Sequence, residues 1–97
     1  EVEARVRLGQ RGTEAAGEST WIALDTNCPW SVAEAIDRAR ALEPLRLALL
    51  EEPVWPPEDH AGLARVRGAT TLPVAAGENA TSVHELARMF AAGALDI

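Results

Sequence analysis

The sequence predicts an α/β fold in which helices alternate with parallel strands, and three observations support this. Stretches with helical spacing of apolar residues alternate with short apolar runs at 20–25, 46–51, 71–78 and 94–97. These runs are nearly continuous in apolar residues, which is typical of parallel strands covered on both faces. An acidic residue closes each of the first three runs, and the acids lie 26 and 27 residues apart, about one βα unit: Asp25, Glu51 and Glu78.

Helices are expected between these runs. "EVEARVRLGQRG" at 1–12 has helical spacing, and the second helix begins at Ser31, with Glu34 placed to complete a capping box, and ends at Pro44. The buried stripe of this second helix is expected to be Val32, Ala35, Ile36, Ala39 and Leu42.

Two further helices complete the pattern. The third is expected to take its first turn from 57–59 and to end near Arg67. The fourth is expected to begin at a second capping box, formed by Ser82 and Glu85, and to end before Gly93.

Two architectures fit this order: an open doubly wound sheet, or an arc of a (β/α)₈ barrel. A complete barrel needs about 250 residues, whereas the chain has 97. On the barrel interpretation, residues 1–97 are an internal segment of the C-terminal barrel domain of a larger enzyme, with three to four consecutive βα units. A start within a helix and an end on the first residues of a strand favour that interpretation.

Composition excludes several classes of function. The net charge is −6, which argues against a nucleic-acid partner, because phosphate binding requires a concentrated basic face. All nine basic residues are arginine, so the chain holds no lysine base or Schiff-base lysine. Cys28 is the one cysteine and cannot form an internal disulfide, so the expected location is the cytoplasm. No apolar run is long enough to cross a membrane.

The three strand-end acids predict a metal site. Carboxyl ends of neighbouring parallel strands lie about 4.8 Å apart at one edge of a sheet, so the three carboxylates should converge and repel one another. A divalent cation would neutralise them, and ligands that are all oxygen favour Mg²⁺. A single strand-end acid is more often a loop or cap residue, but here the caps are already assigned to other residues.

Side-chain alternation along the strands predicts which residues share the face of the acids. That face is expected to hold Ala23, Leu47, Leu49, Val74 and Ala76. The opposite face, toward the helices, is expected to hold Ile22, Leu24, Ala48, Leu50 and Ala75.

The motifs "LDTN", "LEEP" and "AAGEN", in this order and spacing, resemble the third, fourth and fifth barrel strands of the enolase superfamily, in its mandelate racemase-like and acid-sugar dehydratase branch. The resemblance covers essentially the whole chain and less than half of a family member. It implies that Asp25, Glu51 and Glu78 are Mg²⁺ ligands, that Asn27 hydrogen-bonds the substrate, and that Glu52 is a structural residue or a neighbour of the ligands. Muconate cycloisomerase-type members usually carry aspartate in place of Glu78.

The resemblance also implies the chemistry, which is abstraction of the proton next to a carboxylate of an acid sugar or 2-hydroxy acid. The intermediate is then reprotonated or loses a β-hydroxyl. The family's catalytic bases come from strands outside residues 1–97, so no catalytic residue is expected here and the isolated chain should be inactive. Its uncovered sheet edges should promote self-association.

Two alternatives remain open from the sequence. One is a muconate cycloisomerase-type enzyme, which Glu78 disfavours. The other is a non-catalytic binding module resembling flavodoxin or a receiver domain, in which acids also gather at strand ends. Among the remaining residues, His60 and His84 are expected on the surface, and Trp21 is expected to pack at the bottom of the barrel.

Overall fold

The computed structural model describes residues 11–12, 14–15, 17 and 19–97. The predicted first helix at 1–12 therefore lies almost wholly outside the described residues. The remaining order of elements follows the predicted alternation: β1 (Ala23–Asp25), α2 (Val32–Leu42), the 3₁₀ turn η1 (Glu43–Leu45), β2 (Leu49–Glu51), α3 (His60–Ala69), β3 (Val74–Ala75) and α4 (Val83–Ala91).

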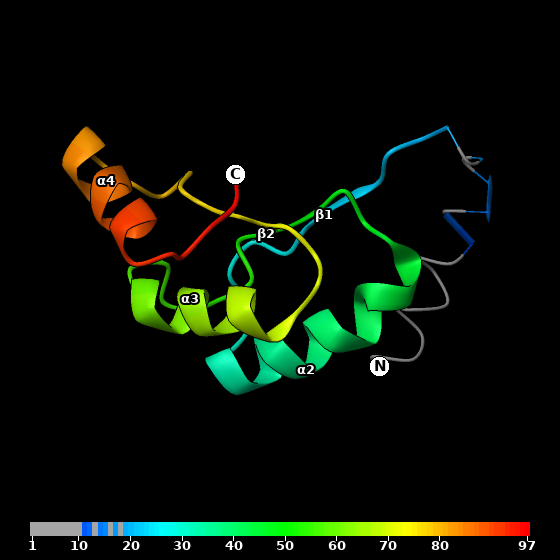
Figure 1. Ribbon diagram of the computed structural model, residues 1–97, viewed down its shortest axis with the longest axis horizontal. Coiled ribbons are helices and arrows are strands. Elements are labelled where there is room, and N and C mark those ends of the chain that lie inside the picture. The colour runs from blue at the N-terminus through cyan, green and yellow to red at the C-terminus, as the bar shows by residue number, and fades with distance from the viewer. Residues whose placement is uncertain (1–10, 13, 16, 18) are drawn as a thin grey trace.

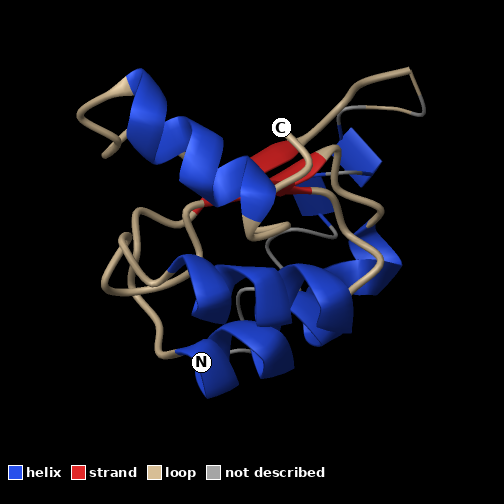
Figure 2. Ribbon diagram, turned by 60° about the vertical axis from the view of Figure 1, so that its left-hand side comes forward, coloured by secondary structure: helices blue, strands red, loops and turns tan. Residues whose placement is uncertain are grey.

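The strands form one parallel sheet in the order β1-β2-β3, which confirms the predicted α/β class with parallel strands. Helices α2 and α3 pack against each other below the strands, and α4 lies beyond α3 at the far end of the molecule (Figure 1). Figure 2 shows the strands above these two paired helices. No helix among the described residues is long and apolar enough to span a membrane.

The strands are shorter than the apolar runs that predict them, and left-handed backbone flanks β2 on both sides. Arg46 has φ 51° just before β2 and Glu52 has φ 47° just after it, and neither conformation continues a strand. Residues 94–97, expected as a fourth strand, are not a strand in the structure. Their backbone nevertheless lies beside β3, because the N–H of Asp96 donates to the carbonyl of Val74 at 2.8 Å.

Register decides the two faces of the sheet. Leu24 pairs with Leu50 and Leu50 with Val74, so these three residues lie on the face toward the helices, where Leu50 and Val74 are fully buried. On the other face, Ala23 pairs with Leu49, as predicted.

The prediction for β3 is wrong by one residue. Ala75 pairs with Glu51 and so faces the acids, whereas Val74 and Ala76 pack with the core on the helix side. The reason is Gly77, whose φ of 127° breaks the alternation between β3 and Glu78. Counting back from Glu78 along a regular strand therefore gives the wrong face.

The N-termini of α2 and α3 are capped by side chains. Ser31 and Glu34 form the predicted capping box, with Ser31 N donating to the Glu34 carboxylate at 2.9 Å. The third helix begins at His60, three residues later than the predicted 57. Asp59 is its N-cap and accepts a hydrogen bond from the N–H of Gly62 at 2.8 Å.

The second predicted capping box forms only by half. The Ser82 hydroxyl accepts from the N–H of Glu85, but the Glu85 carboxylate instead accepts from the N–H of Thr81 at 2.9 Å. Helix α4 ends at Ala91 and Gly93 follows with φ 65°, as predicted from the glycine.

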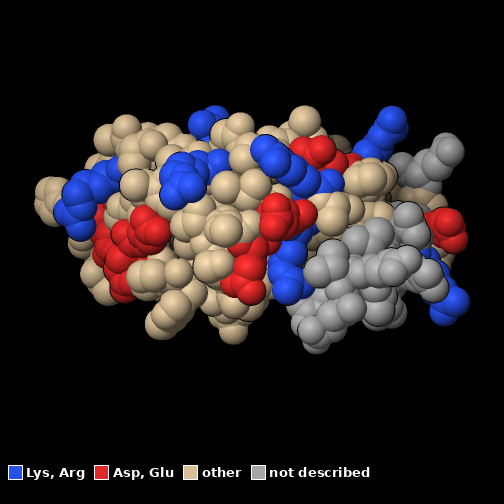
Figure 3. Space-filling model, turned by 90° about the horizontal axis from the view of Figure 1, so that it is seen from below, with Lys and Arg blue, Asp and Glu red and all other residues tan. Residues whose placement is uncertain are grey.

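The hydrophobic core lies between the sheet and the helices. Leu50, Val66 and Val74 are fully buried there, and Trp30 is 6% exposed with the guanidinium of Arg38 at 5.1 Å from its ring centre. Trp21 is 87% exposed, so it does not pack against the described residues, and its predicted place at the bottom of a barrel stays a prediction. The face of α2 and α3 seen in Figure 3 carries acidic and basic side chains interspersed.

Candidate metal centre

The first two acids of the predicted site face each other across neighbouring strands. Asp25 and Glu51 are Cα partners at the carboxyl ends of β1 and β2. Both lie on the face opposite to α2 and α3, where Asp25 is exposed and Glu51 is half-buried. Two carboxylates on one register pair form a concentrated negative site.

The loop after β1 is held against the end of β2. The Thr26 hydroxyl donates to the carbonyls of Glu51 and Glu52, both at 2.9 Å. The N–H of Asn27 donates to Oδ1 of Asp25 at 2.9 Å, which orients that carboxylate. Asn27 has φ 53° and is exposed, and its side-chain amide makes no hydrogen bond to another described residue.

The third acid, Glu78, does not end a strand. It lies in the exposed turn that follows Gly77, beyond the end of β3 at Ala75. Its backbone N–H donates to Oε1 of Glu52 at 3.2 Å. The sequence therefore predicted the correct edge of the sheet for Glu78 and the wrong local structure.

The carboxylates of Glu51 and Glu78 have no hydrogen-bond or ion-pair partner in the described part of the chain. No group of three or more His, Cys, Asp or Glu side chains among the described residues is arranged to hold a metal ion. The donor chemistry fits Mg²⁺, because all three candidate ligands are carboxylates.

The thiol of Cys28 lies among these acids. Burial raises the pKa of Cys28 to about 12, with further contributions from its hydrogen bond to Glu52 and from the negative charges of Glu52, Glu78 and Asp25. The thiol donates to Oε2 of Glu52 at 3.4 Å. The raised pKa keeps the Cys28 thiol protonated at neutral pH, which disfavours a nucleophilic role.

Sequence reasoning gave no specific role to Glu52, which is the one buried charged side chain of the described residues at 3% exposure. Its Oε1 accepts from the N–H groups of Gly77 at 2.8 Å and Glu78 at 3.2 Å. Two sequence signals pointed to it: the family resemblance, which implies a structural residue or a neighbour of the ligands, and its position after Glu51, where strand alternation turns a side chain away from the acidic face.

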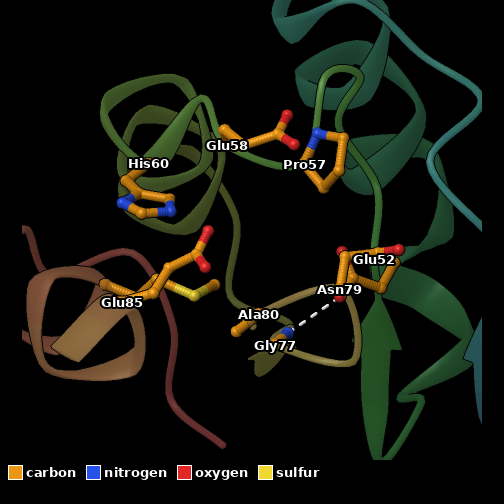
Figure 4. Close-up of a pocket in the computed structure, with 9 residues that line it drawn as sticks. Glu52, Pro57, Glu58, His60, Gly77, Asn79, Ala80 and Glu85 are labelled. Atoms are coloured by element: carbon orange, nitrogen blue, oxygen red, sulfur yellow. Dashed lines mark hydrogen bonds between the residues drawn. The ribbon is translucent and has the colours of Figure 1, made fainter. Parts of the chain in front are cut away.

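A small pocket lies between the carboxyl-end loops and helices α3 and α4. Figure 4 shows Glu52 and Gly77 on one side of this pocket, with His60 and Glu85 on another. His60 was expected on the surface, but it is half-buried and its Nε2 has no partner among the described residues.

Residues 1–97 match the family described as Enolase C-terminal domain-like. The chain belongs to this family. It shares 40% identity over 96 residues with D-galactonate dehydratase of Ralstonia nicotianae, which covers 99% of the chain and 25% of that protein. A D-galactonate dehydratase family member of Catenulispora acidiphila is 36% identical over 91 residues, covering 94% of the chain and 21% of that protein.

A solved enolase from Bradyrhizobium, complexed with magnesium and mandelic acid, has the same fold over this segment. It superposes with a TM-score of 0.94 at 32% identity, covering 100% of the chain and 27% of that structure. The chain thus spans 21% to 25% of the length of the two dehydratase relatives above. These matches confirm the resemblance to the mandelate racemase-like and dehydratase branch.

Proposed function

We propose that residues 1–97 are the metal-binding segment of a barrel enzyme that uses Mg²⁺ to abstract the proton next to a substrate carboxylate. The observation that supports this most strongly is the pairing of Asp25 with Glu51 at the carboxyl ends of adjacent parallel strands. Active sites of barrel enzymes lie at the carboxyl ends of the parallel strands, which is where these two acids are placed.

In this proposal Asp25, Glu51 and Glu78 hold the cation. Glu51 and Glu78 are suited to it because their carboxylates are not engaged by any other described residue. A bound Mg²⁺ would stabilise the negative charge that develops on the substrate carboxylate. Asn27 would hydrogen-bond the substrate, since it lies two residues beyond Asp25 and its side-chain amide has no hydrogen bond to another described residue.

The proposed substrate is a small carboxylate, either an acid sugar or a 2-hydroxy acid, and the proposed reaction is racemisation or dehydration. Support comes from the dehydratase relatives, and from the Bradyrhizobium neighbour with magnesium and mandelic acid. A cycloisomerase is the second candidate, because 3,6-anhydro-alpha-L-galactonate cycloisomerase of Streptomyces coelicolor is 36% identical over 84 residues.

Proton transfer is assigned to groups outside these 97 residues. The chain contains no lysine, and His60 and His84 come from α3 and α4 and not from the carboxyl ends of the strands. The isolated chain should therefore show no turnover of any acid sugar.

The metal site can be tested by titrating Mg²⁺ into the full-length protein by calorimetry, with Glu51→Gln as the test variant. We expect one bound ion and at least about tenfold weaker binding in Glu51→Gln, because even partners of metal ligands contribute about 10–100-fold to affinity. Asp37→Asn is the matched control, since Asp37 is an exposed acid on α2. Equal affinities in the two variants would exclude Glu51 as a ligand.

A further inference from the structure

Glu52 is fixed between the two loops that flank β2. Its backbone N–H donates to the carbonyl of Ala75 at 3.0 Å, and its carbonyl accepts from the N–H of Cys28 at 2.6 Å. Its φ of 47° is uncommon for a residue with a long side chain, and such conformations persist only where surrounding contacts enforce them. The backbone of Glu52 is thus tied to both neighbouring strands.

The side chain of Glu52 turns toward the loop after β3. Oε1 accepts hydrogen bonds from two consecutive amides, Gly77 N at 2.8 Å and Glu78 N at 3.2 Å, and the first of these is drawn in Figure 4. Two amides sharing one ionised acceptor make stronger hydrogen bonds than neutral pairs do. This carboxylate therefore fixes the turn in which Glu78 lies.

The same contacts argue against Glu52 as a direct metal ligand. Oε1 is engaged by two amides and Oε2 accepts from the Cys28 thiol at 3.4 Å. With 3% of the residue exposed, Glu52 cannot reach an ion at the exposed edge without giving up these bonds.

We infer that Glu52 is a positioning residue for Glu78, acting through the hydrogen bonds from Gly77 N and Glu78 N to its carboxylate. Glu78 lies in an exposed turn outside any strand, so the sheet alone does not fix it. Glu52 is covalently next to Glu51, so it couples the placement of the third carboxylate to the end of β2. The functional role of this positioning rests on the proposed metal site, whereas the amide-exchange test of the positioning itself does not require a metal.

The test compares Glu52→Gln with Glu52→Leu in the full-length protein. Glutamine keeps an oxygen that can accept both amides and loses the charge, whereas leucine loses the acceptor at similar volume. Amide hydrogen exchange without metal should accelerate about tenfold at Gly77 and Glu78 in Glu52→Leu and remain near wild type in Glu52→Gln. Mg²⁺ affinity should fall about 10–100-fold in Glu52→Leu and stay within about threefold of wild type in Glu52→Gln.

Glu43→Leu is the matched control. Glu43 holds the loop that precedes β3, because its Oε1 accepts from Thr71 N at 2.8 Å and from the Thr70 hydroxyl at 3.1 Å. That loop lies at the opposite edge of the sheet. Glu43→Leu should accelerate exchange at Thr71 and leave Mg²⁺ affinity unchanged. A general loss of stability would affect both variants alike.

Several outcomes overturn the inference. Equal loss of Mg²⁺ affinity in Glu52→Gln and Glu52→Leu would show that Glu52 acts through its charge, and unchanged exchange at Gly77 and Glu78 in Glu52→Leu would remove the positioning role. If Glu52→Leu does not fold, Gly77→Ala disturbs the same turn from its other side, because alanine disfavours φ 127°. Unaltered Mg²⁺ affinity in a folded Gly77→Ala would equally overturn it. If the wild type binds no Mg²⁺, the proposed function fails while the exchange measurement still decides the positioning role.

Discussion

The acidic residues at the two edges of the sheet differ in whether their carboxylates are hydrogen-bonded. At the amino-end edge, the carboxylate of Glu43 accepts hydrogen bonds from Thr70 and Thr71, and that of Asp96 accepts from Arg67 Nε at 2.8 Å and Val74 N at 2.9 Å. At the carboxyl-end edge, the carboxylates of Glu51 and Glu78 have no partner among the described residues.

The difference separates acids that serve the fold from acids available to a ligand. Hydrogen bonds from Thr71 N and the Thr70 hydroxyl lower the pKa of Glu43. Burial alone would raise the pKa of Asp96, but the hydrogen bonds from Val74 and Arg67 outweigh it and lower the pKa. Ionised carboxylates stabilise the native state at one edge, whereas at the other edge the carboxylates of Glu51 and Glu78 are not engaged by any described residue.

The largest effect on stability without metal is expected from Asp96→Ala. The substitution removes the acceptor of Val74 N, a buried strand residue, and the ion pair with Arg67. We expect a loss of about 2 kcal/mol in the free energy of unfolding, mostly from the unsatisfied strand amide, since exposed ion pairs contribute little. Urea denaturation measures it, and a loss below about 0.5 kcal/mol would contradict the structural role of this edge.

A smaller effect is expected in the pH dependence of stability. The pKa of Glu43 in the folded state lies below its ordinary value of 4.5, so its contribution is complete above pH 4.5 and is lost as pH falls through the folded pKa. Glu43→Gln retains an accepting oxygen but does not titrate, so its unfolding free energy should fall less steeply below pH 4.5. Identical slopes for wild type and variant in acid denaturation would refute this assignment.

The smallest effect is expected from Glu78→Gln in the absence of metal. The Glu78 carboxylate is exposed and has no partner among the described residues, so its loss should change the unfolding free energy by less than about 0.5 kcal/mol. Thermal unfolding without and with Mg²⁺ separates the two roles of this residue. A large destabilisation without metal would remove the contrast between the two edges.

Much of the architecture could be predicted from the sequence because local patterns are strong here. Ser31 with Glu34 marks the start of α2, and Gly93 marks the end of α4. The βα spacing of Asp25 and Glu51 correctly predicted their shared place at the carboxyl ends of neighbouring strands, which the register confirms. The assignment of these acids as metal ligands stays a prediction.

The errors arise where backbone conformation or a helix cap departs from the regular pattern that the sequence suggests. Regular alternation predicts the wrong face for Val74, because Gly77 interrupts the alternation. The predicted start of α3 is three residues early, because Asp59 is the N-cap of this helix and not a residue of its first turn.

The sequence by itself determined the parallel α/β order, the helix caps and the family, because spacing, capping residues and the three acidic motifs are local signals. Only the tertiary structure decided what Glu52 does and how Glu78 is held. Both depend on hydrogen bonds to Glu52 Oε1 from two amides, Gly77 N and Glu78 N, which lie 25 and 26 residues further along the chain. Strand register and backbone conformation bring these groups together, and neither can be predicted from a single stretch of residues.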